Sequence, residues 1–207
     1  MGGVCVLMRV LLSAQQATFS RAGEPVFQPV DIEVCGGGMT VIRGDNGAGK
    51  TTLLRLLAGI LRPSSGRVTR RAGISFMGHG SAVKSELTCR ENLDFRRRFA
   101  PSRSGMDTSA ALARVGLAGH GLRPAITLSA GQKRRLGLAC LLVAPTAIWI
   151  LDEPYASLDD RGCGLVDELL ASHLGRDGAV VLSTHQRLPQ VKPGAQQLVV
   201  KRFRALS

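Results

Sequence analysis

Residues 44–51, with the sequence GDNGAGKT, constrain the fold more than any other part of the chain. They follow a β-branched stretch at residues 40–42 and precede residues 51–61, where leucines share one face of an expected helix. The pattern GxxxxGK[ST] between a strand and a helix is typical of a phosphate-binding loop, because glycines let backbone N–H groups turn toward phosphate oxygens. The sequence therefore predicts an α/β fold of the P-loop NTPase class.

The polar positions of this loop have expected roles toward a nucleotide. Lys50 supplies a positive charge to the β- and γ-phosphates, and Thr51 offers its hydroxyl to Mg²⁺. The helix that starts at Thr51 presents the positive end of its dipole to the same phosphates. The predicted nucleotide-binding residues of the loop are Gly44, Asp45, Asn46, Gly47, Ala48, Gly49, Lys50, Thr51 and Thr52.

An apolar stretch at residues 148–151 ends in two carboxylates, Asp152 and Glu153. At the carboxyl end of a buried strand, Asp152 can hold Mg²⁺ through water. Glu153 is directed to the other side and can polarise an attacking water molecule. Acidic residues after strands are common, but after a phosphate loop this pair indicates nucleotide hydrolysis. Trp149, inside the strand, is expected to be a core residue.

Strand-like and helix-like segments alternate along most of the chain. The expected strands are residues 9–12, 26–34 (broken by Pro29), 40–42, 73–77, 147–151 and 179–183, and the expected helices are residues 51–61, 86–95, 109–115, 132–144 and 165–174, with a turn at 63–66 and a loop at 101–106. This alternation predicts a mostly parallel sheet. Helices between about residues 80 and 140 are expected to form an inserted small lobe, and residues 1–207 to form a single domain.

The composition limits the partners without choosing one. Hydrophobic residues make up 44% of the chain, which excludes a disordered protein. The net charge of +12 points to nucleotide phosphate, nucleic acid or an anionic membrane surface, although clustered arginines are just as often a solvated face. Aromatic residues make up only 4%, which argues against a base-stacking surface, so no nucleic-acid partner is expected.

The cysteines and the apolar runs favour a soluble intracellular protein. The five cysteines lack CxxC spacing and are expected to be reduced and mostly buried. The longest apolar run, residues 136–151, contains Pro145 and is too short for a membrane span. Residues 1–14 resemble a signal peptide only weakly, because Arg9 lies inside the apolar stretch, and Met8 could be the true start.

Three further motifs carry a resemblance to a known family. Residues 128–132 (LSAGQ) resemble the signature motif of ATP-binding-cassette (ABC) ATPases, residues 156–159 (ASLD) their D-loop, and residues 183–185 (STH) their switch-histidine segment. The resemblance implies an ABC-type nucleotide-binding domain with an antiparallel β part. It also implies a head-to-tail dimer that binds ATP and Mg²⁺. By the same resemblance, Ser129, Gly131 and Gln132 contact the opposite ATP, Asp159 belongs to the D-loop, and His185 holds the γ-phosphate.

One position departs from most of the family and narrows the resemblance. His79 stands where most ABC ATPases have a lid glutamine. With residues 76–79 (FMGH) and 184–186 (THQ), the chain resembles the ATPase subunit of the bacterial cytochrome c maturation system, also called the haem exporter. That resemblance implies transmembrane ABC partners, a peripheral position on the cytoplasmic face of the inner membrane, and a role in haem export or in release of a haem-loaded chaperone. Arg21, with Phe19 nearby, is expected to contact adenine in place of an aromatic ring.

Other interpretations stay open at this point. The chain can be the motor of a lipid, peptide or drug exporter, a nucleic-acid-linked ABC ATPase, or a nucleotide-binding module that does not hydrolyse ATP. Residues 128–132 can be an ordinary helix cap, and His79 can be a surface residue without a ligand. His120 and His173 have no motif around them and are expected to lie on the surface.

Overall fold

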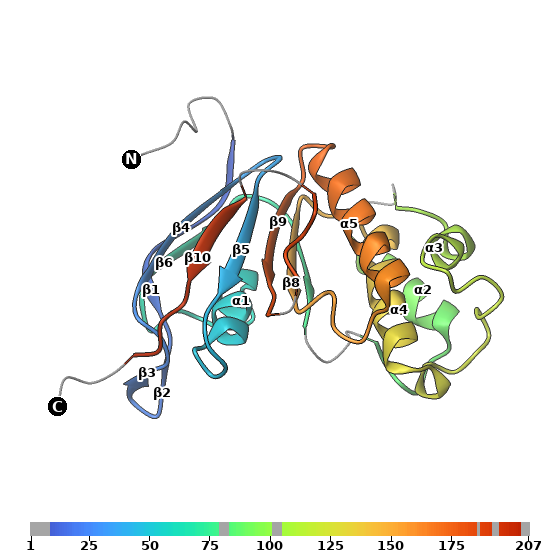
Figure 1. Cartoon of the computed structure of the whole chain (residues 1–207), viewed down its shortest axis with the longest axis horizontal. Coiled ribbons are helices and arrows are strands. Elements are labelled where there is room, and N and C mark those ends of the chain that lie inside the picture. The colour runs from blue at the N-terminus through green and yellow to red at the C-terminus, as the bar shows by residue number, and fades with distance from the viewer. Residues whose placement is uncertain (1–8, 79–82, 101–104, 186, 192–194, 204–207) are drawn as a thin grey trace.

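The computed structural model describes residues 9–78, 83–100, 105–185, 187–191 and 195–203 (Figure 1). Its elements are β1 (Val10–Thr18), β2 (Ser20–Arg21), β3 (Glu24–Pro25), β4 (Val30–Cys35), β5 (Met39–Arg43), α1 (Lys50–Ala58), β6 (Ser65–Arg70), β7 (Ile74–Met77), α2 (Cys89–Arg98), α3 (Thr108–Arg114), the 3₁₀ turn η1 (Ala125–Thr127), α4 (Ala130–Val143), β8 (Ile148–Asp152), α5 (Asp160–Leu174), β9 (Ala179–Ser183) and β10 (Gln196–Val199). Met8, His79 and Gln186, and Cys5 among the five cysteines, lie outside the described ranges.

A five-stranded sheet forms the centre of the fold, in the order β10-β5-β9-β8-β7, and its adjacent strands pair in parallel. All five residues of β8 and all five of β9 are buried. Such continuous apolar strands are typical of a parallel sheet covered on both faces. The strand order puts β5, which leads into the phosphate loop, beside β9 and brings the ends of β8 and β9 next to that loop. The predicted parallel sheet is therefore confirmed.

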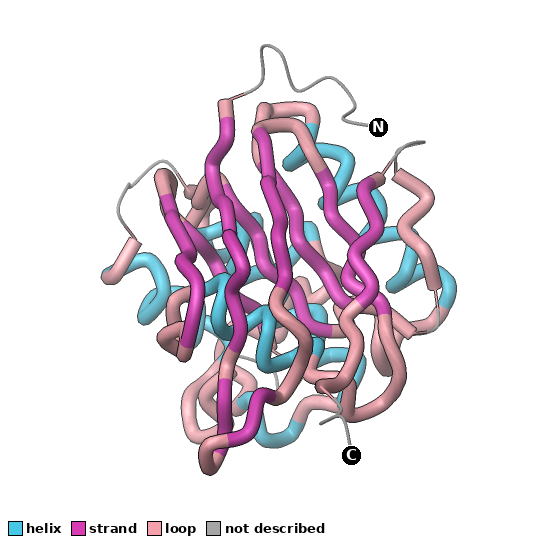
Figure 2. The backbone as a smooth tube through the Cα atoms, turned by 90° about the vertical axis from the view of Figure 1, so that its left-hand side faces the viewer, coloured by secondary structure: helices cyan, strands magenta, loops and turns pink. Residues whose placement is uncertain are grey.

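Alternate residues of β8 enter two separate apolar cores. Trp149 and Leu151 pack with α4 and α5 on one face, whereas Ile148 and Ile150 pack with α1 and the antiparallel strands on the other. This division follows from the two-residue period of a strand. Trp149 is 4% exposed, as expected for a core residue. Figure 2 shows strands crossing the view with the helices behind them.

A second, antiparallel sheet has the order β4-β1-β6 and packs over α1. β1 is longer than the expected strand at residues 9–12, and its register shifts twice against β4. β4 begins only at Val30, directly after Pro29, which cannot donate a ladder hydrogen bond. β6 starts inside the segment 63–66 that the sequence predicts to be a turn, because pairing with β1 orders it.

The helices α2, α3 and α4 pack on one another at the right of Figure 1. α2 begins at Cys89, behind a capping box in which Thr88 and Glu91 satisfy each other's backbone N–H groups. The carboxylate of Asp107 caps α3 without a reciprocal partner, by accepting from Ser109 N at 2.9 Å. Within the described part of the chain, no helix is both long enough and apolar enough to cross a membrane.

Replacing Leu54 by Ala should lower the free energy of unfolding by about 2–5 kcal/mol, because the smaller side chain leaves a cavity in the apolar core. Leu54 lies on the inner face of α1 and is 0% exposed. Urea denaturation followed by circular dichroism measures the effect. Arg55→Ala, at an exposed position of the same helix, is the control and should change stability by less than about 0.5 kcal/mol. Equal losses in both variants would contradict the assignment of α1 to the core.

Candidate active site

The phosphate loop ends at Gly49, which precedes the first helical residue of α1. Gly49 has φ 99°, and a Cβ atom there would lie 2.9 Å from Cδ1 of Phe27, so only glycine suits both the backbone and the space. Lys50 is 7% exposed, and its Nζ donates to the carbonyl oxygens of Gly44 at 2.8 Å and Asp45 at 2.9 Å. Burial lowers the pKa of Lys50, against the opposing effect of nearby carboxylates. The loop therefore holds its lysine inside the curve of its own backbone.

Asp152 lies at the carboxyl end of β8 and joins this loop to the neighbouring strand. Its Oδ2 accepts from Thr51 Oγ1 at 2.8 Å, and its Oδ1 accepts from Ser183 Oγ at 2.6 Å. The register of the sheet, in which Asp152 pairs with Ser183, produces the second contact. Asp152 is 2% exposed. A carboxylate held beside a threonine hydroxyl is an oxygen donor set of the kind that Mg²⁺ prefers.

Glu153 adopts a backbone conformation that non-glycine residues rarely use, with φ 52°. Its N–H donates to the backbone oxygen and to Oγ of Ser183, both at 3.2 Å, and these bonds hold the turn. Its Oε2 accepts from the backbone N–H of His185 at 3.2 Å, and His185 Nε2 lies 3.6 Å from Oε1. The buried Oε1 has no hydrogen-bond partner among the residues that the structure describes. A bound water molecule would satisfy this oxygen.

These groups surround one open cavity of about 450 Å³. It is lined by Arg21, Val26, Asn46, Gly47, Gly49, Lys50, Thr51, Thr52, Asp152, Glu153 and His185. Arg21 comes from the β2–β3 hairpin, whereas Phe19 packs against the apolar core. Gly44, Asp45 and Ala48 line the adjacent surface beside Val200. The structure thus brings the loop, the carboxylates, His185 and Arg21 together, and His79 lies outside the described residues.

The LSAGQ segment lies at a different hollow, of about 480 Å³, which shares no lining residue with the first. Ser129 caps α4: its Oγ accepts from Gln132 N at 3.2 Å, and its N–H donates to Gln132 Oε1 at 3.0 Å. A Cβ atom on Gly131 would lie 2.7 Å from the backbone oxygen of Ser157, so the close approach of the two loops needs glycine. The helix cap and the anion-binding interpretation are compatible here, since a capped helix start still carries a positive dipole.

Asp159 caps the start of α5 and also lines this second hollow. Its Oδ1 accepts from Gly162 N at 2.8 Å and forms an ion pair with Arg135 at 3.0 Å. The side chain therefore ties α4 to α5. The pattern of an Asp three residues before Gly162 indicates such a cap, but only the packing of the two helices provides the arginine.

Sequence reasoning gave no role to two residues next to the carboxylates. Ser183 holds both Asp152 and Glu153, although its partners depend on the strand register. Arg134 lies on α4, is 6% exposed and donates to the backbone oxygen of Gly78 at 3.1 Å. Burial lowers its pKa, and the charges of Asp152 and Glu153 oppose this effect only in part. Its position in a run of basic residues gives no sign of burial.

One of the surface assignments made from sequence was wrong. His173 is half-buried and its ring stacks on Trp149, with centroids 4.0 Å apart and planes at 6°. The aromatic partner comes from β8, so no local signal could reveal the contact. Cys89, Cys140 and Cys163 are buried, as expected.

Residues 27–156 match the model of the ABC transporter family. The chain belongs to the ABC transporter family. Among curated relatives, this ABC protein is 43% identical over 185 residues to the cytochrome c biogenesis ATP-binding export protein CcmA of Xanthomonas campestris pv. campestris (strain 8004), covering 84% of this chain and 86% of the relative. The CcmA protein of Rhodobacter capsulatus is 44% identical, and the match covers 84% of this chain and 81% of the relative. The CcmA protein of Paramagnetospirillum magneticum is 39% identical, with coverage of 92% of this chain and 94% of the relative. These relatives place the ABC protein in the CcmA family.

Solved structures agree on the fold. The ABC protein superposes with a TM-score of 0.79 on a dimeric ATP-binding cassette in a post-hydrolysis state with ADP and phosphate bound, at 21% identity, covering 92% of this chain and 94% of that one. The ATP-binding subunit of another ABC transporter gives a TM-score of 0.77 at 22% identity, with coverage of 85% and 80%. The predicted nucleotide-binding α/β fold is confirmed.

Proposed function

We propose that this ABC protein is the ATP-hydrolysing subunit of a cytochrome c biogenesis transporter. The observation that carries the chemistry is the single cavity in which Lys50, Asp152, Glu153 and His185 meet. The names of the CcmA relatives support the pathway. The work done with ATP is export of haem or release of a haem-loaded chaperone.

The positions of the main lining residues support the following roles toward ATP. Loop N–H groups and Lys50 bind the β- and γ-phosphates, and Arg21 packs on the adenine face. Thr51 and Asp152 would hold Mg²⁺, which when bound would neutralise charge on the phosphates. Glu153 takes a proton from water through its unpartnered Oε1, and the water oxygen attacks the γ-phosphorus as the bond to the ADP oxygen breaks. His185, hydrogen-bonded through its backbone to Glu153, orients the γ-phosphate.

A second copy of the chain completes the site. The hollow at Ser129 and Gly131 offers a helix start and a hydroxyl to an anion but contains none of the phosphate loop. Head-to-tail pairing of two copies would put this hollow over the γ-phosphate bound by the other copy, with Gln132 and Asp159 at the contact. Two ATP molecules would then lie in the interface.

The membrane partners contact the segment that begins at His79 and includes α2. Phe95 is 39% exposed and Phe99 74% exposed, with ring centroids 4.9 Å apart, and Lys84 Nζ lies 4.1 Å from the centre of Phe95. Exposed neighbouring aromatic rings are typical of a surface that another protein covers. We place the subunit at the cytoplasmic face of the bacterial inner membrane through this contact.

Affinity purification of the tagged protein from its native membrane tests the pathway. We expect cytochrome c maturation membrane subunits to co-purify, with haem absorption in the recovered complex. Phe99→Ser should reduce their recovery, whereas Val199→Ser, at a similarly exposed position on β10, should not. Recovery with lipid, peptide or drug permeases, or with ribosomes or DNA, would keep the ATPase chemistry and overturn the pathway.

Ser183→Ala should lower the rate of ATP hydrolysis by about tenfold, because Asp152 and the Glu153 turn both lose a partner. Coupled-enzyme assays measure the rate, and a nucleotide titration measures ATP affinity, which should change little. Ser109→Ala, exposed on α3, is the matched control. A wild-type rate in Ser183→Ala would show that Asp152 is held in place without this hydroxyl.

A further inference from the structure

A third cavity lies at the opposite end of β8 from the nucleotide site. It has a volume of about 470 Å³ and is lined by residues around the amino ends of β8 and β9, together with parts of α4 and α5 and the end of α3. We call it the amino-end cleft. None of its lining residues lines the nucleotide cavity or the hollow at Ser129. Its volume is in the range of cavities that bind small molecules.

The amino-end cleft contains a buried donor without an acceptor. Trp149 lines it and is 4% exposed, and its Nε1 has no hydrogen-bond partner within the described ranges. Buried indole N–H groups usually have a partner, because leaving one unpaired costs about 1–3 kcal/mol. Because Nε1 is itself buried, an acceptor bound in the cleft would remove this cost once the ring shifts slightly toward it.

Flat aromatic surface forms part of the wall. The ring of His173 stacks on Trp149 and also lines the cleft. Burial lowers the pKa of His173, with a smaller raising effect of the Ala179 and Ala147 backbone, which favours the neutral ring. Leu141, Leu142 and Leu169 add apolar surface around the two rings. This wall suits a flat, largely apolar molecule.

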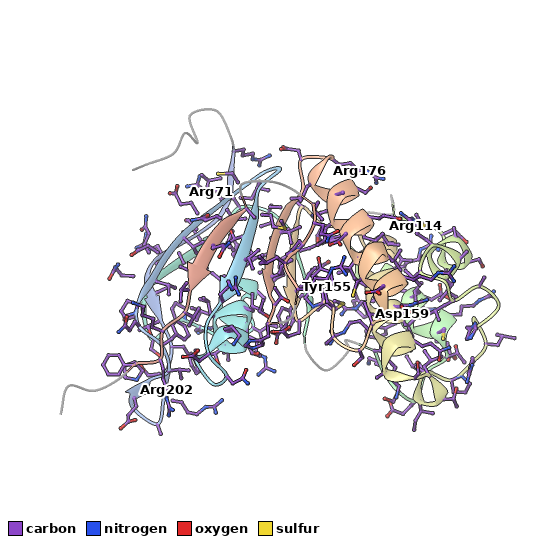
Figure 3. All side chains as sticks on the ribbon, in the orientation of Figure 1. Arg71, Arg114, Tyr155, Asp159, Arg176 and Arg202 are labelled. Carbon is purple, nitrogen blue, oxygen red and sulfur yellow. The ribbon has the colours of Figure 1, made fainter. Side chains whose placement is uncertain are left out.

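The charges at the rim favour an anion. Arg114 at the end of α3 and Arg176 after α5 both line the cleft and lie on the same side of the molecule in Figure 3. Arg176 donates to Ser172 Oγ at 3.2 Å, which holds it at the rim. Asp177 also lines the cleft, but its carboxylate lies against the backbone of Gly36, where a Cβ atom would be 2.6 Å from Oδ1. Arg114 also pairs with exposed Glu168 at 3.0 Å, so Arg176 is the better placed cation.

We propose that the amino-end cleft is a second ligand site, which binds a small aromatic anion. The ring system of the ligand would pack beside Trp149 and His173. Its carboxylate or sulfonate would accept hydrogen bonds from Arg176 and, after a small shift of the ring, from the indole N–H. This site is independent of ATP hydrolysis, because it uses none of the residues of the nucleotide cavity.

The single tryptophan of the chain makes the proposal directly measurable. We would titrate the full-length protein with 1-anilinonaphthalene-8-sulfonate, an aromatic anion whose emission rises when it leaves water, and follow Trp149 fluorescence. We expect saturable quenching with one molecule bound per chain, unchanged by saturating ADP with Mg²⁺. Displacement of the probe by ADP, or the absence of saturable quenching, would overturn the proposal.

Two variants locate the bound probe. Arg176→Glu should raise the dissociation constant by about tenfold or more, as expected for loss of a charged hydrogen bond. Arg161→Glu makes the same charge change at an exposed position in the first turn of α5 and should leave the affinity within about twofold. Equal weakening in both variants would mean that the probe responds only to net charge, and would overturn the site.

Ser172→Phe fills the cleft from the exposed side of α5 and should abolish the quenching. An unchanged far-ultraviolet circular dichroism spectrum and unchanged ATP hydrolysis would show that the variant is folded. Wild-type affinity in both Ser172→Phe and Arg176→Glu would place the probe elsewhere on the protein and contradict the proposal.

Discussion

Replacing Glu153 by Gln should reduce steady-state ATP hydrolysis by about 10²–10⁴-fold, the usual contribution of a general base. Glutamine keeps the size of the side chain and the acceptor for the His185 N–H, but it cannot take a proton from water. ATP binding should persist, so the variant should accumulate as an ATP-bound dimer. Size-exclusion chromatography with ATP and Mg²⁺ detects the dimer, and phosphate release measures the rate.

Glu33→Gln is the matched control for this change. Glu33 is exposed on β4 and does not line the nucleotide cavity, so its substitution should leave hydrolysis at the wild-type rate. Normal turnover in Glu153→Gln would remove Glu153 as the base and make His185 the next group to test. A monomer in ATP would instead contradict the head-to-tail dimer, even with hydrolysis lost.

Replacing Lys50 by Ala should weaken ATP binding by about 10–100-fold, the effect of losing a charged hydrogen bond at a phosphate. Lys50 is buried at the start of α1, where its ammonium group already bonds to two loop carbonyl oxygens. In the bound state the same group would turn to the β- and γ-phosphates. Fluorescent-nucleotide titration or calorimetry measures the affinity directly.

Arg67→Ala, exposed on β6, removes one positive charge away from the cavity and serves as the control. It should bind ATP as the wild type does, because exposed charges beyond a Debye length are screened. If Lys50→Ala kept wild-type affinity, the phosphate-binding role of the loop lysine would be wrong. If Lys50→Ala bound ATP normally but no longer hydrolysed it, Lys50 would act only in the hydrolysis step and not in binding.

The strands differ in how well the sequence predicts them, for a physical reason. β8 and β9 are predicted correctly because they are almost entirely apolar and such strands are stable only when both faces are buried. β10 has the sequence QQLV and mostly exposed side chains, so it shows no strand pattern, and it forms only because β5 offers it a parallel partner. β6 likewise depends on β1.

The site divides in the same way. The loop at residues 44–51 and the strand that ends in Asp152 are local patterns, and each could be found without any knowledge of the other. Strand order and register decide which of these residues meet. They bring Thr51 to Asp152, 101 positions away, and Ser183 to Asp152, 31 positions away. Helix packing likewise decides two further contacts. Arg134 is buried because α4 packs against β7, and His173 stacks on Trp149 because α5 packs on the face of the sheet that carries Trp149.

The sequence by itself determined the class of the fold, the phosphate loop, the acidic strand end and the family. Each of these depends on short contiguous motifs, whose residues are neighbours in the chain and form their pattern without any contact to distant parts of it. Tertiary structure alone decided which side chains meet: the register of β8 against β9, the strained turn at Glu153, the separation of the Ser129 hollow from the nucleotide cavity, and the amino-end cleft with its unpaired indole. Contacts between distant segments have no local signature, since they arise only when burial of apolar surface selects one packing of the helices on the sheet.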